Sequence, residues 1–130
     1  MALERAFELY PEVKLVMSAE LYGFSGNIRK IKEICEQLGA LFIEDVSEAM
    51  GATYRGSPCG NFGDYAAISY NGNKMITGSL GGCLLTNELK VANKAHKWST
   101  QARENAAGYL QGEVDYNYRM NNVIAGDIWG

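Results

Sequence analysis

The feature of this sequence that most constrains its fold is a pair of short apolar runs with an amphipathic helix between them. Residues 13–17 and 41–43 are apolar segments of strand length, and residues 27–38 carry apolar side chains at helical spacing. Two strands that are joined through a helix lie parallel in one sheet, because a parallel pair needs a long crossover. The sequence therefore predicts an α/β fold, with a mostly parallel sheet and helices on both of its faces.

Other segments extend this pattern on both sides. The helix between the two runs is expected to have Gly26 or Asn27 as its first cap and Gly39 as its last. Two further helices are predicted at residues 3–9 and 87–100, and two further strands at residues 66–70 and 83–86. The direction of the last strand stays open, and the tail from residue 101 onward is expected to be irregular.

The pattern of elements begins and stops abruptly. The chain opens with a helix that no strand precedes, and it ends at Gly130 without a stop signal. We therefore expect residues 1–130 to form a partial domain, whose remaining strands belong to a longer protein.

Composition and charge argue against several classes of partner. Hydrophobic residues make up 47% of the chain and charged residues 21%, which is typical of globular proteins. A net charge of −3 gives no excess of cations to neutralise a nucleic-acid backbone, so no nucleic-acid partner is expected. No apolar run approaches the roughly 20 residues that span a bilayer. Charged residues stand where a signal peptide would be apolar, so we expect a cytoplasmic protein without membrane contact.

The cysteines and the one histidine give no pattern of metal ligands. Cys35, Cys59 and Cys83 are odd in number and scattered, and His96 has no Cys or His near it in the sequence. Structural zinc sites need such residues at close, regular spacing. We therefore expect three reduced thiols and no metal site.

Polar residues follow the predicted strands at two places. Asp45 follows the run at residues 41–43, and Ser69 and Lys74 lie at and just after the run at residues 66–70. Ligands of parallel sheets gather at the carboxyl ends of the strands. There, a desolvated lysine can condense with an aldehyde, a serine can hold a phosphate, and an aspartate can pair with a pyridine nitrogen. On the residues alone, a surface lysine and a capping aspartate remain the alternatives.

Five short motifs occur in one order along almost the whole chain. They are Leu21-Tyr22-Gly23, Ile43 to Ala52, Gly60-Asn61-Phe62-Gly63-Asp64, Ser69 to Lys74 with Gly81-Gly82, and Tyr116-Asn117-Tyr118-Arg119-Met120. Together they resemble the DegT/DnrJ/EryC1/StrS family of sugar aminotransferases, which depend on pyridoxal 5′-phosphate (PLP). The resemblance implies the aspartate-aminotransferase type of fold, of which this chain would be the central part of the large domain.

The resemblance also implies a role for each of five residues. Lys74 matches the lysine that forms a Schiff base with PLP and shuttles the substrate proton. Asp45 matches the acid that pairs with the pyridine nitrogen, Glu48 a position near the ring 3-hydroxyl, and Ser69 a phosphate ligand. Asn117 matches an asparagine that reaches the cofactor phosphate of the neighbouring subunit, so a homodimer with a shared active site is expected.

The implied reaction moves an amino group from an amino acid, expected to be glutamate, to the keto carbon of a nucleotide-linked keto-deoxy sugar. Such reactions serve the biosynthesis of surface-polysaccharide or glycan sugars. The acidic Glu48, together with the segment from Tyr70 to Lys74, is similar to the branch that acts on UDP-linked 4-keto-6-deoxy N-acetyl sugars.

The sequence also departs from the family pattern. Glu20 stands where relatives usually have histidine, and residues 78–82 replace the usual Gly-Glu-Gly-Gly. The N-terminal segment and the C-terminal small domain of the family are absent from these residues, so this chain alone is expected to be inactive. Two alternatives stay open: a degenerate homologue or fragment that folds without chemistry, and a dehydratase of the same fold. Lys74 argues against the dehydratase, which carries histidine at that position.

Overall fold

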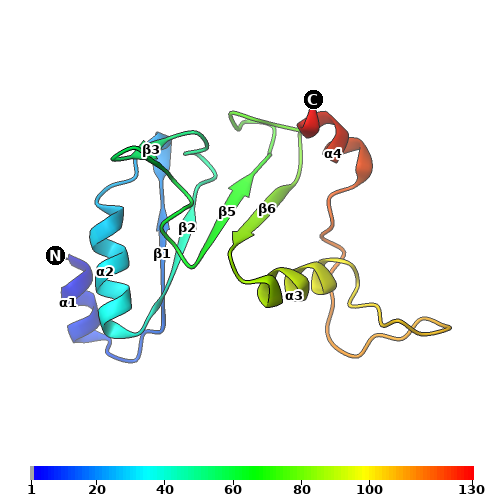
Figure 1. Cartoon of the computed structure of the whole chain (residues 1–130), viewed down its shortest axis with the longest axis horizontal. Helices are drawn as coiled ribbons and strands as arrows, with labels where there is room; N and C mark the ends of the chain where they lie inside the picture. The colour runs from blue at the N-terminus through cyan, green and yellow to red at the C-terminus, as the bar shows by residue number, and fades with distance from the viewer. Residues whose placement is uncertain (1) are drawn as a thin grey trace.

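A four-stranded sheet forms the centre of the molecule. The computed structural model describes residues 2–130, and this sheet contains β1 (Leu15–Ala19), β2 (Leu41–Asp45), β5 (Tyr65–Ser69) and β6 (Gly82–Thr86) in the order β1-β2-β5-β6 (Figure 1). β2 lies parallel to both β1 and β5, whereas β6 is antiparallel to β5. The predicted α/β fold with a mostly parallel sheet is therefore confirmed, and the last strand proves to be antiparallel.

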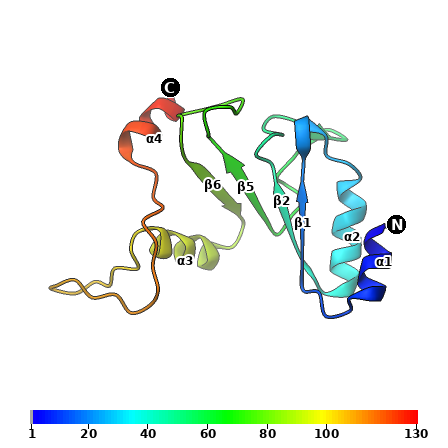
Figure 2. The same cartoon turned by 180° about the vertical axis from the view of Figure 1, so that it is seen from behind.

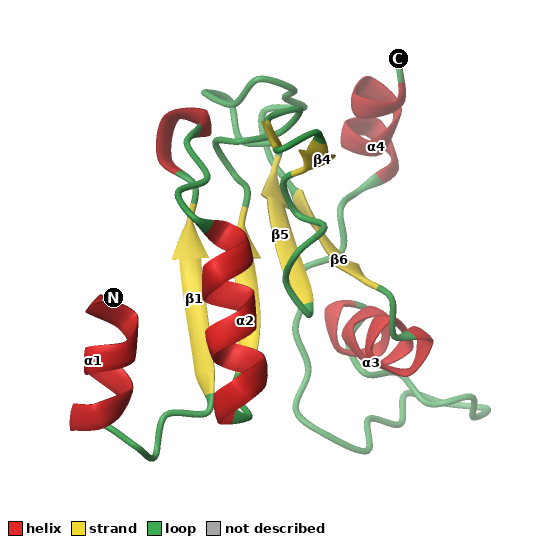
Figure 3. Ribbon diagram, turned by 60° about the vertical axis from the view of Figure 1, so that its left-hand side comes forward, coloured by secondary structure: helices red, strands yellow, loops and turns green. Residues whose placement is uncertain are grey.

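The helix between β1 and β2 begins and ends where the sequence predicts. In α2 (Ile28–Leu38), the side chain of Asn27 caps the start by accepting a hydrogen bond from the backbone N–H of Lys30 at 3.4 Å. Gly39 ends the helix in the left-handed region at φ 67°, where a glycine meets no steric penalty. Figure 3 shows α2 in front of β1 and β2, where it covers one face of the sheet.

The main hydrophobic core lies between the N-terminal helices and this face. α1 (Ala2–Leu9) packs beside α2 and contributes the buried Phe7. Ile28 and Ile34 of α2 belong to the same cluster as Phe42 of β2. Burying each of these side chains contributes about 1.5–3 kcal/mol relative to exposure. The two helices therefore anchor the strands whose carboxyl ends form one edge of the sheet.

A small hairpin between β2 and β5 was not predicted. β3 (Thr53–Tyr54) pairs antiparallel with β4 (Ser57–Pro58). Strands of two residues are too short to show a period of two, so no sequence pattern marks them. In the loop that follows, a Cβ at Gly63 would lie 2.6 Å from the carbonyl oxygen of Tyr65. The backbone passes so closely there that only glycine fits.

The boundaries of β1 and β2 differ slightly from the predicted ones. β1 begins two residues later than the apolar run at residues 13–17, and Val13, which precedes the strand, packs against the core cluster. β2 continues past residue 43 to Asp45, which pairs with both Ala19 and Ala67. Asp45 is therefore held by the sheet itself rather than by the turn that follows.

The second face of the sheet is open at β1 and β2. Alternation along the paired strands places four exposed apolar side chains on the face opposite α2, namely Leu15, Met17, Leu41 and Leu84. Met17 is 62% exposed. Apolar surface of this kind is normally covered by another element or another chain.

The C-terminal part of the chain runs away from the sheet and returns to it. α3 (Leu89–Ser99) packs against β6, and the arm, residues 100–121, projects from it (Figures 1 and 2). α4 (Asn122–Trp129) contradicts the prediction of an irregular tail. Asn121 caps the start of this helix. Ile124 of the helix lies so close to Gly78 that a Cβ added at Gly78 would be 2.9 Å from Cγ2 of Ile124. Within residues 2–130, no helix is long and apolar enough to cross a membrane.

Candidate active site

Three of the predicted site residues meet at the carboxyl ends of β2 and β5. Asp45 ends β2, Glu48 lies in the turn after it, and Lys74 lies in the turn between β5 and β6. All three line one pocket of about 90 Å³, whose other walls come from residues 19–21 and Ser47. Because β2 and β5 are neighbours in the sheet, residues that are distant in the sequence reach the same edge.

Lys74 and Glu48 form an ion pair inside this pocket. Lys74 Nζ lies 3.4 Å from Glu48 Oε1, and the Lys74 side chain is only 16% exposed. The backbone N–H of Tyr22 donates a hydrogen bond to Glu48 Oε2 at 3.1 Å. This N–H, and then the Lys74 ammonium, lower the pKa of Glu48 below its ordinary value. The ion pair in turn fixes the position of the Lys74 side chain in the pocket.

Asp45 has a capping role as well as a place in the pocket. Its Oδ1 accepts a hydrogen bond from the backbone N–H of Ser47 at 3.0 Å, which fixes the turn after β2. This bond uses one carboxylate oxygen and orients the group at the pocket wall. The capping function and a ligand function are therefore compatible in the same side chain.

A larger hollow of about 750 Å³ adjoins the small pocket. The two share Ser47, Glu48 and Lys74, and the larger one is also lined by Tyr22, Gly23, Asn73 and Met75 and by residues 50–52. A volume of this size is typical of sites that bind small molecules. Lys74 and Glu48 thus stand between a small polar pocket and a wider open one.

Ser69 and Asn117 do not line either of these hollows. Ser69 ends β5 on the same face of the sheet as Asp45, because Asp45 pairs with Ala67 and side chains alternate along the strand. Its hydroxyl accepts a hydrogen bond from the backbone N–H of Asn71 at 3.3 Å. Asn117 is exposed on the arm, where it forms a β-bridge with Thr100. A single chain therefore brings together three of the five predicted residues.

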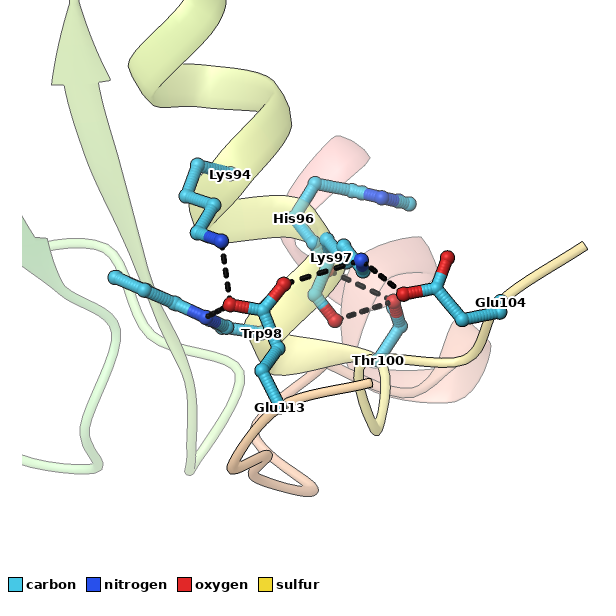
Figure 4. Close-up of polar contacts among 7 residues, drawn as sticks. All are labelled: Lys94, His96, Lys97, Trp98, Thr100, Glu104 and Glu113. Atoms are coloured by element: carbon cyan, nitrogen blue, oxygen red, sulfur yellow. Dashed lines mark hydrogen bonds and ion pairs between the residues drawn. The ribbon is translucent and has the colours of Figure 1, made fainter. Parts of the chain in front are cut away.

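A cluster of charged side chains ties the arm to α3 (Figure 4). Glu113 pairs with Lys94, with Lys97 at 3.1 Å, and with the indole N–H of Trp98 at 3.0 Å. Glu104 pairs with Lys97 at 2.5 Å. The hydrogen bond from Lys94, followed by those from Trp98 and Lys97, lowers the pKa of Glu113 to about 2. These contacts hold the arm against α3, and no sequence pattern indicated them.

Glu20, which the sequence marks only as a departure from its relatives, is buried at the wall of the small pocket. Its side chain is 1% exposed, and neither carboxyl oxygen has a hydrogen-bond partner within the described residues. Burial raises the pKa of Glu20 to about 7; Cys59 opposes the shift, whereas Glu44 and Asp45 add to it. Only the fold reveals this, because burial depends on which segments cover the residue.

Known proteins with similar sequences or structures include several aminotransferases. EpsN of Bacillus subtilis, named a pyridoxal phosphate-dependent aminotransferase, is 40% identical over 129 residues, which are 96% of this chain and 33% of EpsN. A GDP-perosamine synthase of Caulobacter vibrioides is 39% identical over 115 residues, 88% of this chain and 31% of the synthase. The solved structure of Helicobacter pylori PseC, an aminotransferase involved in the biosynthesis of pseudoaminic acid, matches with a TM-score of 0.83 at 21% identity. That match covers 89% of this chain and 32% of PseC.

The fold and these similarities place the chain among the PLP-dependent aminotransferases. Within that class, residues 2–126 match the DegT/DnrJ/EryC1/StrS aminotransferase family, and the chain belongs to this family. The resemblance seen in the five motifs is thereby confirmed. The matches include a UDP-4-amino-4,6-dideoxy-N-acetyl-beta-L-altrosamine transaminase of Helicobacter pylori. The chain spans about a third of the length of the relatives it matches.

The residues of the small pocket fit PLP in their chemistry. Lys74 offers an amine for the aldehyde, and Asp45 offers a fixed anion at the end of a strand. Ser69 lies on the same face of the sheet as Asp45 and would be the residue to hold the phosphate. The donor set for the ring end of the cofactor is therefore present in this chain.

Proposed function

We propose that the protein containing this chain transfers an amino group from an amino acid, with glutamate as the expected donor, to a nucleotide-linked keto-deoxy sugar. The acceptor is the keto carbon, the cofactor is PLP, and the product serves surface-polysaccharide or glycan biosynthesis. The observation that carries this proposal is the convergence of Asp45, Glu48 and Lys74 on one pocket. It is supported by two relatives whose names refer to perosamine synthesis and pseudoaminic acid biosynthesis.

Each of the converging residues has a role in this proposal. Lys74 forms the covalent link to the cofactor and then moves the proton at the substrate carbon. Asp45 presents a negative charge that keeps a facing pyridine nitrogen protonated. When bound, PLP supplies the electron sink that stabilises the substrate carbanion. Glu48 orients Lys74 and accepts hydrogen bonds near the ring, and Ser69 contributes to holding the phosphate.

The ion pair between Lys74 and Glu48 sets a condition for this chemistry. Lys74 must lose a proton before it can attack an aldehyde or accept a substrate proton. Its separation of 3.4 Å from Glu48 is longer than the roughly 2.7–2.9 Å of a strong charge-assisted hydrogen bond. Lys74 can therefore leave Glu48 at a modest energetic cost when a ligand enters the pocket.

The larger hollow is the proposed site of the sugar nucleotide. Tyr22 stands on its wall with 91% of its surface exposed, so its ring is free to stack on a planar group. The local pattern around Glu48 and residues 70–74 favours a UDP-linked sugar, whereas the 39% identity to a GDP-perosamine synthase favours a GDP-linked one. We propose UDP as the carrier, and both nucleotides belong in the test.

A homodimer with a shared active site completes the proposal. Asn117 lies on the exposed arm and does not line the pockets of its own chain. The arm is held to α3 by the pairs of Glu113 and Glu104, so it is ordered before any partner binds. An ordered, exposed arm is suited to carry Asn117 to the cofactor phosphate of a neighbouring subunit.

The test is the transfer of labelled nitrogen by the full-length protein. With PLP and nitrogen-15 glutamate, the protein should place the label on a UDP-linked or GDP-linked 4-keto-6-deoxy sugar, as followed by mass spectrometry. Lys74→Ala should abolish labelling, and Asp45→Asn should reduce it by about 10-fold or more, because a charged interaction worth roughly 1.5–3 kcal/mol is lost. The exposed Lys90→Ala is the matched control and should leave labelling unchanged. A protein that binds PLP but labels neither sugar would overturn the proposed reaction.

A further inference from the structure

Two buried carboxyl groups, those of Glu20 and Glu44, interact with each other beside the candidate site. Glu20 follows β1 directly, and Glu44 is the penultimate residue of β2, with none of its surface exposed. The backbone N–H of Glu20 donates a hydrogen bond to the carbonyl oxygen of Asp45 at 3.0 Å. The segment that carries Glu20 is thus joined directly to the strand end that carries Asp45.

The carboxylate of Glu44 is surrounded by backbone donors. It accepts hydrogen bonds from the N–H groups of Gly60 at 2.8 Å, of Phe62 at 2.6 Å, and of Gly63. Three such donors favour the ionised form of a carboxyl group. The same three bonds attach the loop at residues 60–63 to the end of β2.

Glu20 has the opposite environment. No N–H or O–H group within the described residues donates a hydrogen bond to its carboxyl oxygens, and the titratable groups around it are Cys59, Glu44 and Asp45. Burial, and then Glu20 itself, raise the pKa of Cys59 to about 11, so this thiol stays protonated. The other charged groups of the pocket, Lys74 and Glu48, are paired with each other. Within residues 2–130, no cation pairs with Glu20.

Two buried carboxylates cannot both remain charged at close range without a large electrostatic cost. The donors around Glu44 make it the ionised member of the pair. We propose that Glu20 is a positioning residue that remains protonated up to neutral pH and shares its proton with Glu44. The shared proton holds the loop at residues 60–63 and the β2 end in the arrangement that presents Asp45 to the pocket. This last step rests on the proposed function, whereas the proton sharing does not.

The first test is the pH dependence of stability in the cofactor-free, full-length protein. A carboxyl whose pKa rises from 4.5 in the unfolded chain to about 7 in the fold binds its proton more tightly when folded. The contribution of Glu20 to the stability of the fold is therefore fully present below about pH 4.5 and is lost as the pH rises through 7. Denaturant midpoints measured between pH 5 and 8.5 should show this fall in the wild type.

The informative variant is Glu20→Gln, which keeps a donor for Glu44 and cannot ionise. It should remove the fall in stability between pH 5 and 8.5, whereas the exposed control Glu12→Gln should retain it. An unchanged fall in Glu20→Gln would overturn the proposal. If the variant does not fold, infrared spectra of the wild type decide instead. A protonated carboxyl band that is present at pH 6 and lost above pH 8 supports the shared proton. The absence of this band at pH 6 overturns the proposal.

The second test concerns the positioning of Asp45. In the wild type, PLP affinity should weaken several-fold above pH 7 as Glu20 ionises, and Glu20→Gln should bind PLP with little change over the same range. An identical pH profile of PLP affinity in both proteins would overturn the positioning role. If PLP binds neither protein, the proposed function fails, and the stability profiles still decide the proton sharing on their own.

Discussion

Nζ of Lys74 lies 3.4 Å from Oε1 of Glu48, so two turns that follow different strands are joined by one ion pair. Glu48 follows β2 and Lys74 follows β5, and the two residues meet because these strands are parallel neighbours. The pair marks the centre of the candidate site. It also holds the Lys74 side chain at the wall of the small pocket.

Replacing Glu48 should change how Lys74 captures PLP. Glu48→Gln removes the carboxylate that lies 3.4 Å from Lys74, so Lys74 has no ion pair to break before it reacts with the aldehyde. We expect covalent PLP capture, followed by absorbance in the full-length protein at one pH, to become several-fold faster. The exposed Glu33→Gln serves as control and should leave the rate unchanged. A rate that is unchanged or lower in Glu48→Gln would show that the ion pair does not restrain Lys74.

Gly63→Ala should destabilise the protein by about 1–3 kcal/mol, as overpacking in a tight region generally does. Its Cβ would lie 2.6 Å from the carbonyl oxygen of Tyr65 and 2.9 Å from that of Phe42. Backbone movement would also disturb the hydrogen bond that the N–H of Gly63 donates to Glu44. Gly72→Ala, at a position where a Cβ meets nothing within 4 Å, is the matched control. Equal unfolding midpoints for the two variants would contradict this account of the loop.

The arm should loosen in acid. The pKa of Glu113 is lowered to about 2 in the folded chain, so its contribution to stability is present above its ordinary value of 4.5 and is lost as the pH falls toward 2. Hydrogen exchange of residues 101–118 should therefore speed up between pH 4.5 and 2, relative to that of α2. In Glu113→Gln the arm should already exchange faster at pH 5, whereas the exposed Glu88→Gln should behave as the wild type. Equal protection of the arm in all three proteins would show that these pairs do not hold it.

The local features of the fold and the shared edge of its parallel strands were predictable from the sequence, whereas other contacts between distant segments were not. Asn27 and Gly39 cap α2 because capping depends on neighbouring residues and on a local backbone angle. The convergence of Asp45 and Lys74 was predictable because strands that alternate with helices share their carboxyl edge. In contrast, α4 depends on contacts with Gly78, which lies more than forty residues earlier in the chain.

The role of Glu20 shows the same limit at the candidate site. In the sequence this residue is one acid among 15 acidic residues. Its burial depends on its closeness to Glu44, which lies in β2, and to Cys59, which follows β4. Ser69 shows the same limit. The alternation of side chains along β5 places Ser69 on the same face of the sheet as Asp45, but its distance from a phosphate depends on the bound cofactor. Contacts between distant segments therefore determine the burial of Glu20 and the position of Ser69, and a sequence pattern does not show these contacts.

The isolated 130-residue chain should associate with itself and bind PLP weakly or not at all. Leu15, Met17, Leu41 and Leu84 expose apolar surface on the sheet face that α2 does not cover. Light scattering should detect oligomers whose size increases with protein concentration. Met17→Lys should reduce this association, and Leu89→Lys, an exposed apolar position on α3, is the control. A monomeric chain that binds PLP tightly would contradict this expectation.

The most direct test of the central claim is to locate the covalent bond to PLP. The full-length protein is incubated with PLP, reduced with borohydride, digested and mapped by mass spectrometry. The account predicts a single reduced PLP adduct on Lys74 and no adduct in Lys74→Ala, because no other residue can be both the anchor and the base. An adduct at another lysine in the wild type, or an equally abundant adduct in Lys74→Ala, would contradict it.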